Sequence, residues 1–305
     1  MPIGPFCGMV DGAGAEAMGR QANRFGPALA AGLCAATAAW GAPRQGPADC
    51  RPALARADSL DALGPRGEIR LASGSRVVLG SLRWPEDAQV AARAGDWLLA
   101  LRGRPLTIVP RGEGDRWGRL RIDASVDEEG IDLAGGLIDA GLAWADSGEA
   151  DTLCRPALLR VEAGARAAKR GLWQASLPEA GDGAALRARA GGFAVIEGRV
   201  RHVGERASRT YLDFVRRGED GLTVTVSKRT WRRMLEHGLS AAGIEGRRVR
   251  VRGVIELWRS PVIDVGAPEL IEPLDDEAAP AEASDRRPGA GPAGMERDGE
   301  RAPRR

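Results

Sequence analysis

Short runs in which apolar and polar residues alternate dominate residues 64–126 and predict β-strands. The runs GEIRLA, SRVVLGSLRW and RPLTIVPR are of this kind, and Gly or Pro separates them. Between the second and third runs, PEDAQVAARAGDWLLALRG has helical spacing, with Val90, Trp97 and Leu98 able to share one face. This part of the chain is therefore predicted to be a set of strands with a helix packed on them.

Two further helices are predicted after these strands. Apolar residues recur at helical spacing after Asp132, and Gly141 is expected to end that helix. Another helix is expected to start at Pro156, because the missing N–H of proline costs nothing in a first turn, and to end at Gly171. Together these elements predict a mainly β domain with packed helices over residues 64–177.

Strand-like runs return in residues 191–274. They are FAVIEGRVRHV, RTYLDFVR, GLTVTVSK, RRVRVRGVIEL and PVIDVGAPELIEPL, and one short helix, TWRRMLEHG, interrupts them. Five strands and one helix in so short a stretch are typical of a small barrel of the oligonucleotide-binding (OB) type. The fold class predicted is α+β, mainly β, with two barrels in succession.

Three remaining segments are predicted to lie outside these domains. Residues 43–63 and 178–190 have the composition of linkers. Residues 275–305 contain almost no large apolar residue and are predicted to be a disordered tail.

The N-terminus has the organisation of a secretory signal peptide. Residues 25–42 form an apolar stretch of small residues that follows Arg20 and Arg24, and Ala39–Gly41 offers a cleavage site. Several glycines argue against the alternative of a first core helix. Leu33 argues against a lipid anchor on the cysteine after it. Residues 1–42 are therefore predicted to direct export to the periplasm or the medium.

Composition excludes several classes of protein. The 305 residues carry 44 basic and 42 acidic side chains, a formal charge of +2, which excludes a chain that binds nucleic acid by bulk charge. No apolar stretch reaches the ~20 residues of a membrane-spanning helix, so no transmembrane domain is expected. His202 and His237 are the only histidines and no CxxC motif is present, so neither a zinc site nor a Ser-His-Asp triad is predicted.

The cysteines agree with export. Cys7 and Cys34 lie in the predicted signal peptide, which leaves Cys50 and Cys154 in the mature chain. A single remaining pair often forms a disulfide in an oxidising compartment, and the alternative is two free thiols. The sequence predicts a Cys50–Cys154 bond.

Four stretches between residues 64 and 175 follow the order and spacing of one enzyme family. They are GEIRLASGSRVVLGSLRWPE, DRWGRL, LIDAGLAWA and VEAGARAAKRGLW. The first is similar to an opening D-G-D, an Arg-Leu strand and D-[AT]-P-E, and the second to a [DK]-[RK]-[YW]-G-R loop. The other two are similar to L-[VI]-x-x-G-[LW]-A-x-[VA] and to a helix that closes on G-[LI]-W. On these motifs the chain resembles the staphylococcal nuclease (thermonuclease) family, which implies a five-stranded OB-type barrel with packed helices.

The resemblance also implies a site for phosphodiester hydrolysis, in which carboxylates and Ca²⁺ orient water, a Glu acts as general base and two arginines neutralise charge. Carried over by position, the general base is Glu86 and the second arginine is Arg119. The other positions differ from the family. The metal-ligand Asp is replaced by Arg83, the first arginine by Val78, and the D-G-D carboxylates by Pro65 and Gly67.

Neighbouring residues offer partial replacements. Arg76 precedes Val78 by two residues and so shares its strand face, and Glu68 is a nearby carboxylate. Arg83, however, places a positive charge where a cation would bind, and one Glu supplies too few oxygen ligands for Ca²⁺. The candidate catalytic residues are therefore Glu86, Arg119 and Arg76, with no metal ligands, and Ca²⁺ is expected only if the site functions. The plainer alternative makes Glu86 a carboxylate at a helix start and Arg119 a turn residue.

The second predicted barrel has 15 basic and 11 acidic residues, a net charge of 15 − 11 = +4. In RRVRVRG the arginines lie on one side of a strand and the valines on the other. OB-type barrels bind single strands through basic grooves and stacked aromatics. The candidate nucleic-acid-binding residues are Arg248, Arg250, Arg252, Arg232 and Trp231. The alternative is that the alternation of arginine and valine only marks an ordinary half-buried strand, without a ligand.

Two other aromatics could stack on bases, Tyr211 and Phe214. They are three residues apart in a strand and so face opposite sides, and at least one is expected in the core.

Three functions fit this pattern. The first is an exported bacterial protein with a degenerate thermonuclease-like site that binds single-stranded nucleic acid or an envelope protein. The second is an active phosphodiesterase that uses Glu86 and Arg119. The third is a non-catalytic scaffold of the cell envelope.

Overall fold

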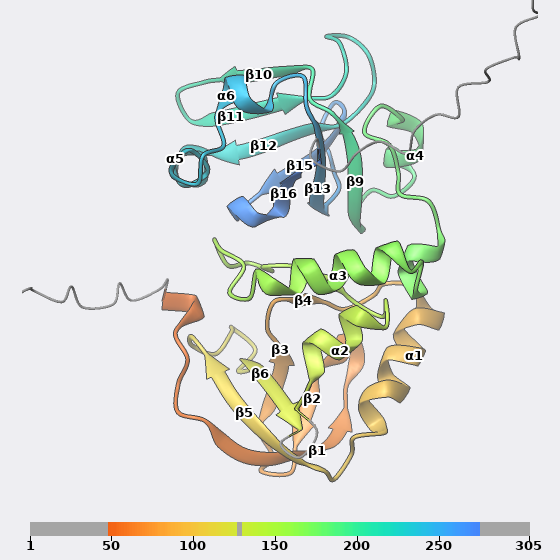
Figure 1. Cartoon of the computed structure of the whole chain (residues 1–305), viewed down its shortest axis with the longest axis vertical. Coiled ribbons are helices and arrows are strands. Elements are labelled where there is room, and N and C mark those ends of the chain that lie inside the picture. Colours follow the sequence, from red (N-terminus) through yellow and green to blue (C-terminus); the bar gives the residue numbers. More distant parts are fainter. Residues whose placement is uncertain (1–47, 127–129, 275–305) are drawn as a thin grey trace, which may run out of the picture. The chain divides into compact units, whose positions relative to one another are not determined.

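The computed structural model describes residues 48–126 and 130–274, which belong to one compact unit (Figure 1). The predicted signal peptide, 1–42, and the predicted tail, 275–305, lie outside the described residues. Helices in the described part of the chain are too short or too polar to cross a membrane. The fold is mixed α and β, and we call residues 48–177 the first body and residues 178–274 the second body.

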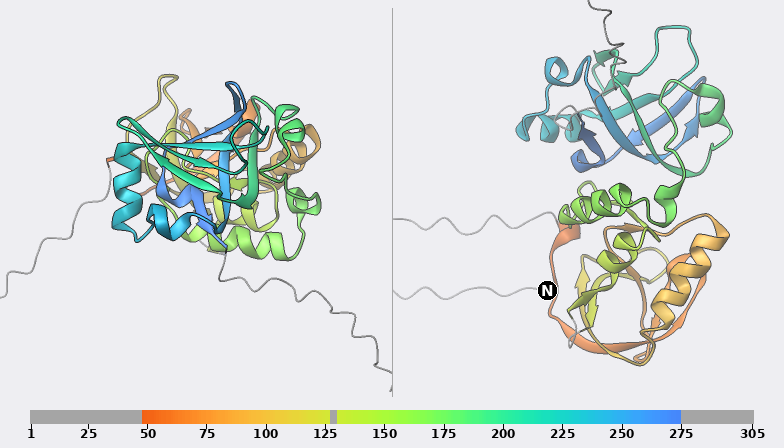
Figure 2. Two further views of the ribbon diagram at one scale, coloured as in Figure 1. Left: turned by 90° about the horizontal axis from the view of Figure 1, so that it is seen from above. Right: turned by 45° about the vertical axis from the view of Figure 1, so that its right-hand side comes forward.

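Five strands of the first body close into a barrel. They are β1 (Arg56–Leu63), β2 (Ile69–Leu71), β3 (Arg76–Leu79), β5 (Pro105–Arg111) and β6 (Leu120–Val126). Strand β1 pairs with β2 and β5, β2 pairs with β3, and β5 pairs with β6, all antiparallel. The parallel pair β3–β6 closes the ring of strands, which the right-hand view of Figure 2 shows.

Short elements complete the first body. Two-residue strands are β7 (Ile131–Asp132), which pairs antiparallel with β6, and the pair β4 (Leu82–Arg83) and β8 (Trp144–Ala145). Single 3-10 turns are η1 (Ala48–Cys50), η2 (Pro65–Gly67) and η3 (Gly171–Gln174).

The three helices predicted for this body are confirmed as α1 (Ala88–Leu99), α2 (Leu133–Asp139) and α3 (Ala157–Ala167). The carboxylates of Asp87 and Asp132 accept backbone N–H groups in the first turns of α1 and α2, which fixes where each helix begins. Pro156 precedes α3 at its predicted start. Leu98, Leu137 and their neighbours then turn one face of each helix into the barrel core.

The second body holds eight strands and three short helices. The strands are β9 (Phe193–Arg199), β10 (His202–Glu205), β11 (Arg209–Asp213), β12 (Thr223–Ser227), β13 (Arg248–Val254), β14 (Glu256–Leu257), β15 (Pro261–Val265) and β16 (Ile271–Pro273). The helices are α4 (Gly183–Arg187), α5 (Lys228–Glu236) and α6 (Ala241–Ile244), and η4 (Pro268–Leu270) is a 3-10 turn.

Both bodies pair their strands in the same order. If β9 with β10 and β13 with β14 are taken as two bent strands, the first strand pairs with the second and the fourth, and the third runs parallel to the fifth. In the first body β1, β2, β3, β5 and β6 follow this order, and in each body a helix follows the third strand. The order is consistent with the OB-type arrangement predicted from the sequence.

Two predicted linkers are parts of the folded bodies instead. Within 43–63, β1 forms because Leu60 is buried in the barrel core between β2 and β5. Within 178–190, α4 forms because Leu186 is buried in the core of the second body. Each segment contributes few buried side chains, so its apolar pattern is weak.

The predicted disulfide is confirmed. Cys50 in η1 is bonded to Cys154, 104 residues later, in the segment that precedes α3. The bond thus fastens the start of the described chain to the loop between β8 and α3.

Candidate functional site

Two of the predicted catalytic residues meet at one carboxylate. Arg76, the first residue of β3, donates from Nε and Nη2 to the two oxygens of Glu68, at 2.8 and 2.9 Å. Nη1 of Arg119 lies 3.9 Å from Oε2 of the same Glu68. The structure therefore brings Arg76 and Arg119 together, and Glu68 is the carboxylate between them.

Both arginines are already paired within the chain. Arg119 donates from Nε and Nη2 to Asp115 at 2.8 Å, and its guanidinium lies 4.8 Å from the ring centre of the half-exposed Trp117. The hydrogen bond from Arg76 holds the pKa of Glu68 below its usual value. Burial acts against ionisation of Asp115, but hydrogen bonds from the Arg119 and Trp117 backbone N–H groups lower its pKa overall. A phosphate would have to displace these carboxylates.

Glu86 has different partners. It lies between β4 and the start of α1, and its two carboxylate oxygens both accept from the backbone N–H of Phe193, at 3.2 Å. Oε1 also pairs with Arg83 at 3.1 Å. Within the described residues, no hydrogen bond or ion pair joins Glu86 to Arg76 or Arg119. Arg76 and Arg119 thus meet at Glu68, whereas Glu86 pairs with Arg83 and the backbone of Phe193.

Arg83 works with Glu86 at this contact. Its guanidinium lies 5.3 Å from the ring centre of Phe193, the same residue whose N–H binds Glu86. Burial raises the pKa of Asp146, and the positive charge of Arg83 acts in the opposite direction. Arg83 and Glu86 of the first body therefore both contact Phe193, the first residue of β9 in the second body.

The donor set does not fit Ca²⁺. Arg83 occupies the position of the expected metal-ligand carboxylate, and both oxygens of Glu68 are taken by Arg76. Within residues 48–126 and 130–274, no group of three or more His, Cys, Asp or Glu side chains is placed to hold a metal ion. In the structure Glu68 and Asp115 are the ion-pair partners of Arg76 and Arg119.

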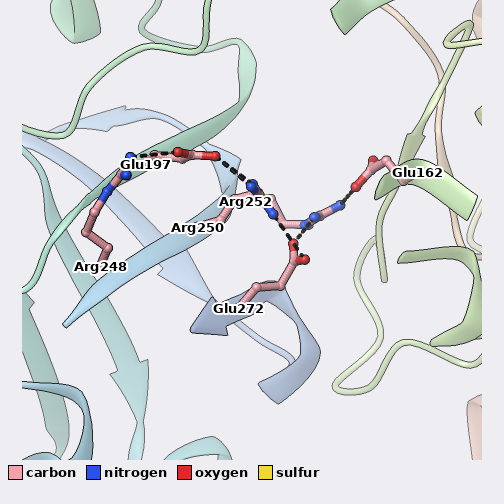
Figure 3. A network of polar contacts seen from close by, with 6 residues as sticks. All are labelled: Glu162, Glu197, Arg248, Arg250, Arg252 and Glu272. Atoms are coloured by element: carbon pink, nitrogen blue, oxygen red, sulfur yellow. Dashed lines mark hydrogen bonds and ion pairs between the residues drawn. The ribbon is translucent and has the colours of Figure 1, made fainter. Parts of the chain in front are cut away.

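The prediction that β13 presents a basic face to solvent is wrong for its last two arginines. Arg250 and Arg252 are 4% and 0% exposed. Figure 3 shows why, since arginines and glutamates alternate along one chain of ion pairs: Arg248, Glu197, Arg250, Glu272, Arg252 and Glu162. Arg250 and Arg252 therefore face carboxylates rather than solvent.

The last pair of this network joins the two bodies. Nη1 of Arg252 lies 2.5 Å from Oε2 of Glu162 in α3, and both side chains are 0% exposed. Arg252 also donates to the carbonyl of Ala145, and Glu162 accepts the N–H of the same residue. Burial raises the pKa of Glu162, while Arg252 opposes that rise.

The remaining predicted nucleic-acid-binding residues fall in different places. Trp231 is 1% exposed and belongs to the core of the second body. Arg232 is exposed on α5, and Arg248 is exposed but paired with Glu197 at 3.0 Å. Phe214 is buried and Tyr211 half-buried, which confirms that at least one of them serves the core.

Other contacts run between the same two bodies. Arg229 of α5 pairs with Asp151 at 2.7 Å, and Glu269 accepts from the hydroxyl of Thr152 at 3.0 Å. A small apolar cluster adds Trp144 and Trp173 from the first body and Val195 and Phe193 from the second. Trp144 and Trp173 meet edge to face with ring centres 4.7 Å apart. The bodies are thus joined by ion pairs, a hydrogen bond and aromatic contacts.

A set of arginines that the sequence did not single out lines an open groove of about 1160 Å³ on the second body. They lie at the end of β9, before and after β10, and in the loop between β11 and β12: Arg199, Arg201, Arg206, Arg216 and Arg217. They fall in turns rather than in a periodic strand, so only an inventory of loop arginines could have found them. No protein-family model matches this chain, and no curated protein matches it at a significant level.

Proposed function

We propose that this chain is an exported, thermonuclease-like protein that binds nucleic acid and does not cleave it. The observation that carries the proposal is the position of Glu86. The carboxylate that would serve as general base accepts a backbone N–H of the second body and pairs with Arg83. It is a structural contact between the two bodies.

The order of the strands supports the thermonuclease-like fold. A closed five-stranded barrel with a helix after its third strand and further helices after its fifth is what the four sequence stretches imply. The Cys50–Cys154 bond supports an oxidising compartment, where such bonds persist.

The partners of the candidate catalytic residues support binding without cleavage. Attack on a phosphodiester requires an activated water and neutralisation of the charge that develops on phosphate. Arg76 and Arg119 are neutralised by Glu68 and Asp115, and within the described chain no further carboxylate pairs with either of them. The arrangement retains two cations in one place, whereas the candidate general base, Glu86, is engaged by Phe193 and Arg83, which supports binding without cleavage.

One observation favours the alternative of an active phosphodiesterase. Arg76 and Arg119 converge on Glu68, as two phosphate-binding arginines of an active site would converge on a substrate. If a phosphate replaced Glu68 between them, Arg76 would supply the function of the arginine missing at Val78.

Digestion of labelled DNA and RNA separates the two functions. We expect the purified chain to leave single and double strands intact, both with Ca²⁺ and with a chelator, because the candidate general base is engaged by Phe193 and Arg83. The matched control is Arg119→Ala, which should behave as the parent chain does. Cleavage that requires Ca²⁺ and disappears in Arg119→Ala would show that the chain is a nuclease.

A further inference from the structure

The arginine-lined groove of the second body has a lining that suits a polyanion. Its lining includes five arginines and three carboxylates, those of Asp213, Glu219 and Glu245. We propose that this groove binds the phosphodiester backbone of single-stranded nucleic acid. The inference rests on the proposed nucleic-acid-binding function and gives it a location.

The groove arginines have no carboxylate partners among the described residues, unlike those of β13. Arg199 donates to the carbonyl of Gly246 and Arg206 to that of Glu205, and the guanidiniums of the other three have no ion pair there. Elsewhere in this body Arg187, Arg209 and Arg250 each hold a carboxylate. A guanidinium that holds no carboxylate can bind two oxygens of a phosphate with its parallel N–H groups.

The three carboxylates of the groove accept hydrogen bonds from a hydroxyl and from backbone N–H groups of the second body. Asp213 accepts from the hydroxyl of Thr223, and Glu219 accepts the backbone N–H of Arg216. Glu245 accepts the N–H of Val203. These acidic groups stabilise turns and strand ends and leave the guanidiniums unpaired, so the groove presents a surplus of positive charge.

The face next to the groove suits a single strand. Tyr211 lies two residues before Asp213 on β11 and therefore on the same face of the sheet. Its partner across the strands is Gly204, where an added Cβ would meet only the ring of His202, at 3.7 Å. The space above Gly204, on the strand beside Tyr211, is therefore open. A base can stack on an aromatic ring there only if it is unpaired, as in a single strand.

Binding of a fluorescent oligonucleotide of about 12 nucleotides, followed by anisotropy at low salt, tests the groove. The groove variant is Arg216→Glu with Arg217→Glu. The control, Arg93→Glu with Arg160→Glu, changes the net charge equally at two exposed positions outside the groove. We expect the groove variant to raise Kd about tenfold or more, the control to change it less than about threefold, and Kd of the parent chain to rise steeply with salt.

Two further measurements make the outcome specific. Tyr211→Leu should raise Kd for the oligonucleotide but leave Kd for inorganic polyphosphate unchanged, since only bases stack. Thermal unfolding should be the same in the groove variant as in the parent chain, because Arg216 and Arg217 are exposed. If the groove and control variants weaken binding equally, or if the groove variant does not change Kd, the groove is not the binding site, and the proposed function still stands. No binding by the parent chain at low salt would overturn the proposed function itself.

Discussion

Replacing Arg252 with methionine is expected to lower the free energy of unfolding by about 3–5 kcal/mol, because it leaves a buried carboxylate without its partner. Glu162 is 0% exposed and lies 2.5 Å from the Arg252 guanidinium. Without that charge its ionised form stays in a dry environment with only the N–H of Ala145 as a donor. Chemical denaturation monitored by tryptophan fluorescence measures the loss.

A variant of the same strand provides the control. Arg248→Met removes an arginine that is exposed and paired with Glu197, so the loss should stay below about 1 kcal/mol. Adding Glu162→Leu to Arg252→Met should recover part of the stability, since the buried charge is then removed. A loss for Arg252→Met no larger than that for Arg248→Met would mean that the pair is not buried as described.

Reduction of the Cys50–Cys154 bond is expected to lower the free energy of unfolding by about 2–4 kcal/mol. The bond spans 104 residues, so its removal restores much conformational freedom to the unfolded chain. Denaturation curves with and without reductant measure the difference.

The matched variant replaces both cysteines, as Cys50→Ala with Cys154→Ala. It should unfold at the same denaturant concentration with and without reductant, close to that of the reduced parent chain. Cys7 and Cys34 remain in this variant, so any effect of reductant that persists in it would belong to them. A parent chain insensitive to reductant would contradict the stabilising role of the bond.

The helices of the first body could be predicted from the sequence because their signals are local. Asp87 and Asp132 stand directly before apolar runs of helical spacing, and each caps its helix in the structure. Strand β1 could not be predicted, because RADSLDAL turns only Leu60 fully into the core. Its place in the barrel depends on pairing with β2 and β5, and that pairing has no local signature.

The site shows the same limit. The alternation in β13 correctly separates arginines from valines, but it cannot show what each side faces. Arg250 is opposite Glu197 on one neighbouring strand and Glu272 on the other, and α3 brings Glu162 to Arg252. These contacts connect residues far apart in sequence, so a strand that reads as a basic surface is buried.

The contact of Glu86 with Phe193 is the centre of the proposal, and hydrogen exchange at the Phe193 amide tests it most directly. Because both oxygens of Glu86 accept this N–H, we expect it to be protected in the parent chain. Glu86→Ala should then speed its exchange about tenfold or more, whereas Glu86→Gln, which keeps an acceptor oxygen, should have a smaller effect. Equal exchange in the parent chain and in Glu86→Ala would show that Glu86 does not hold the second body, and would leave it free to serve as a base.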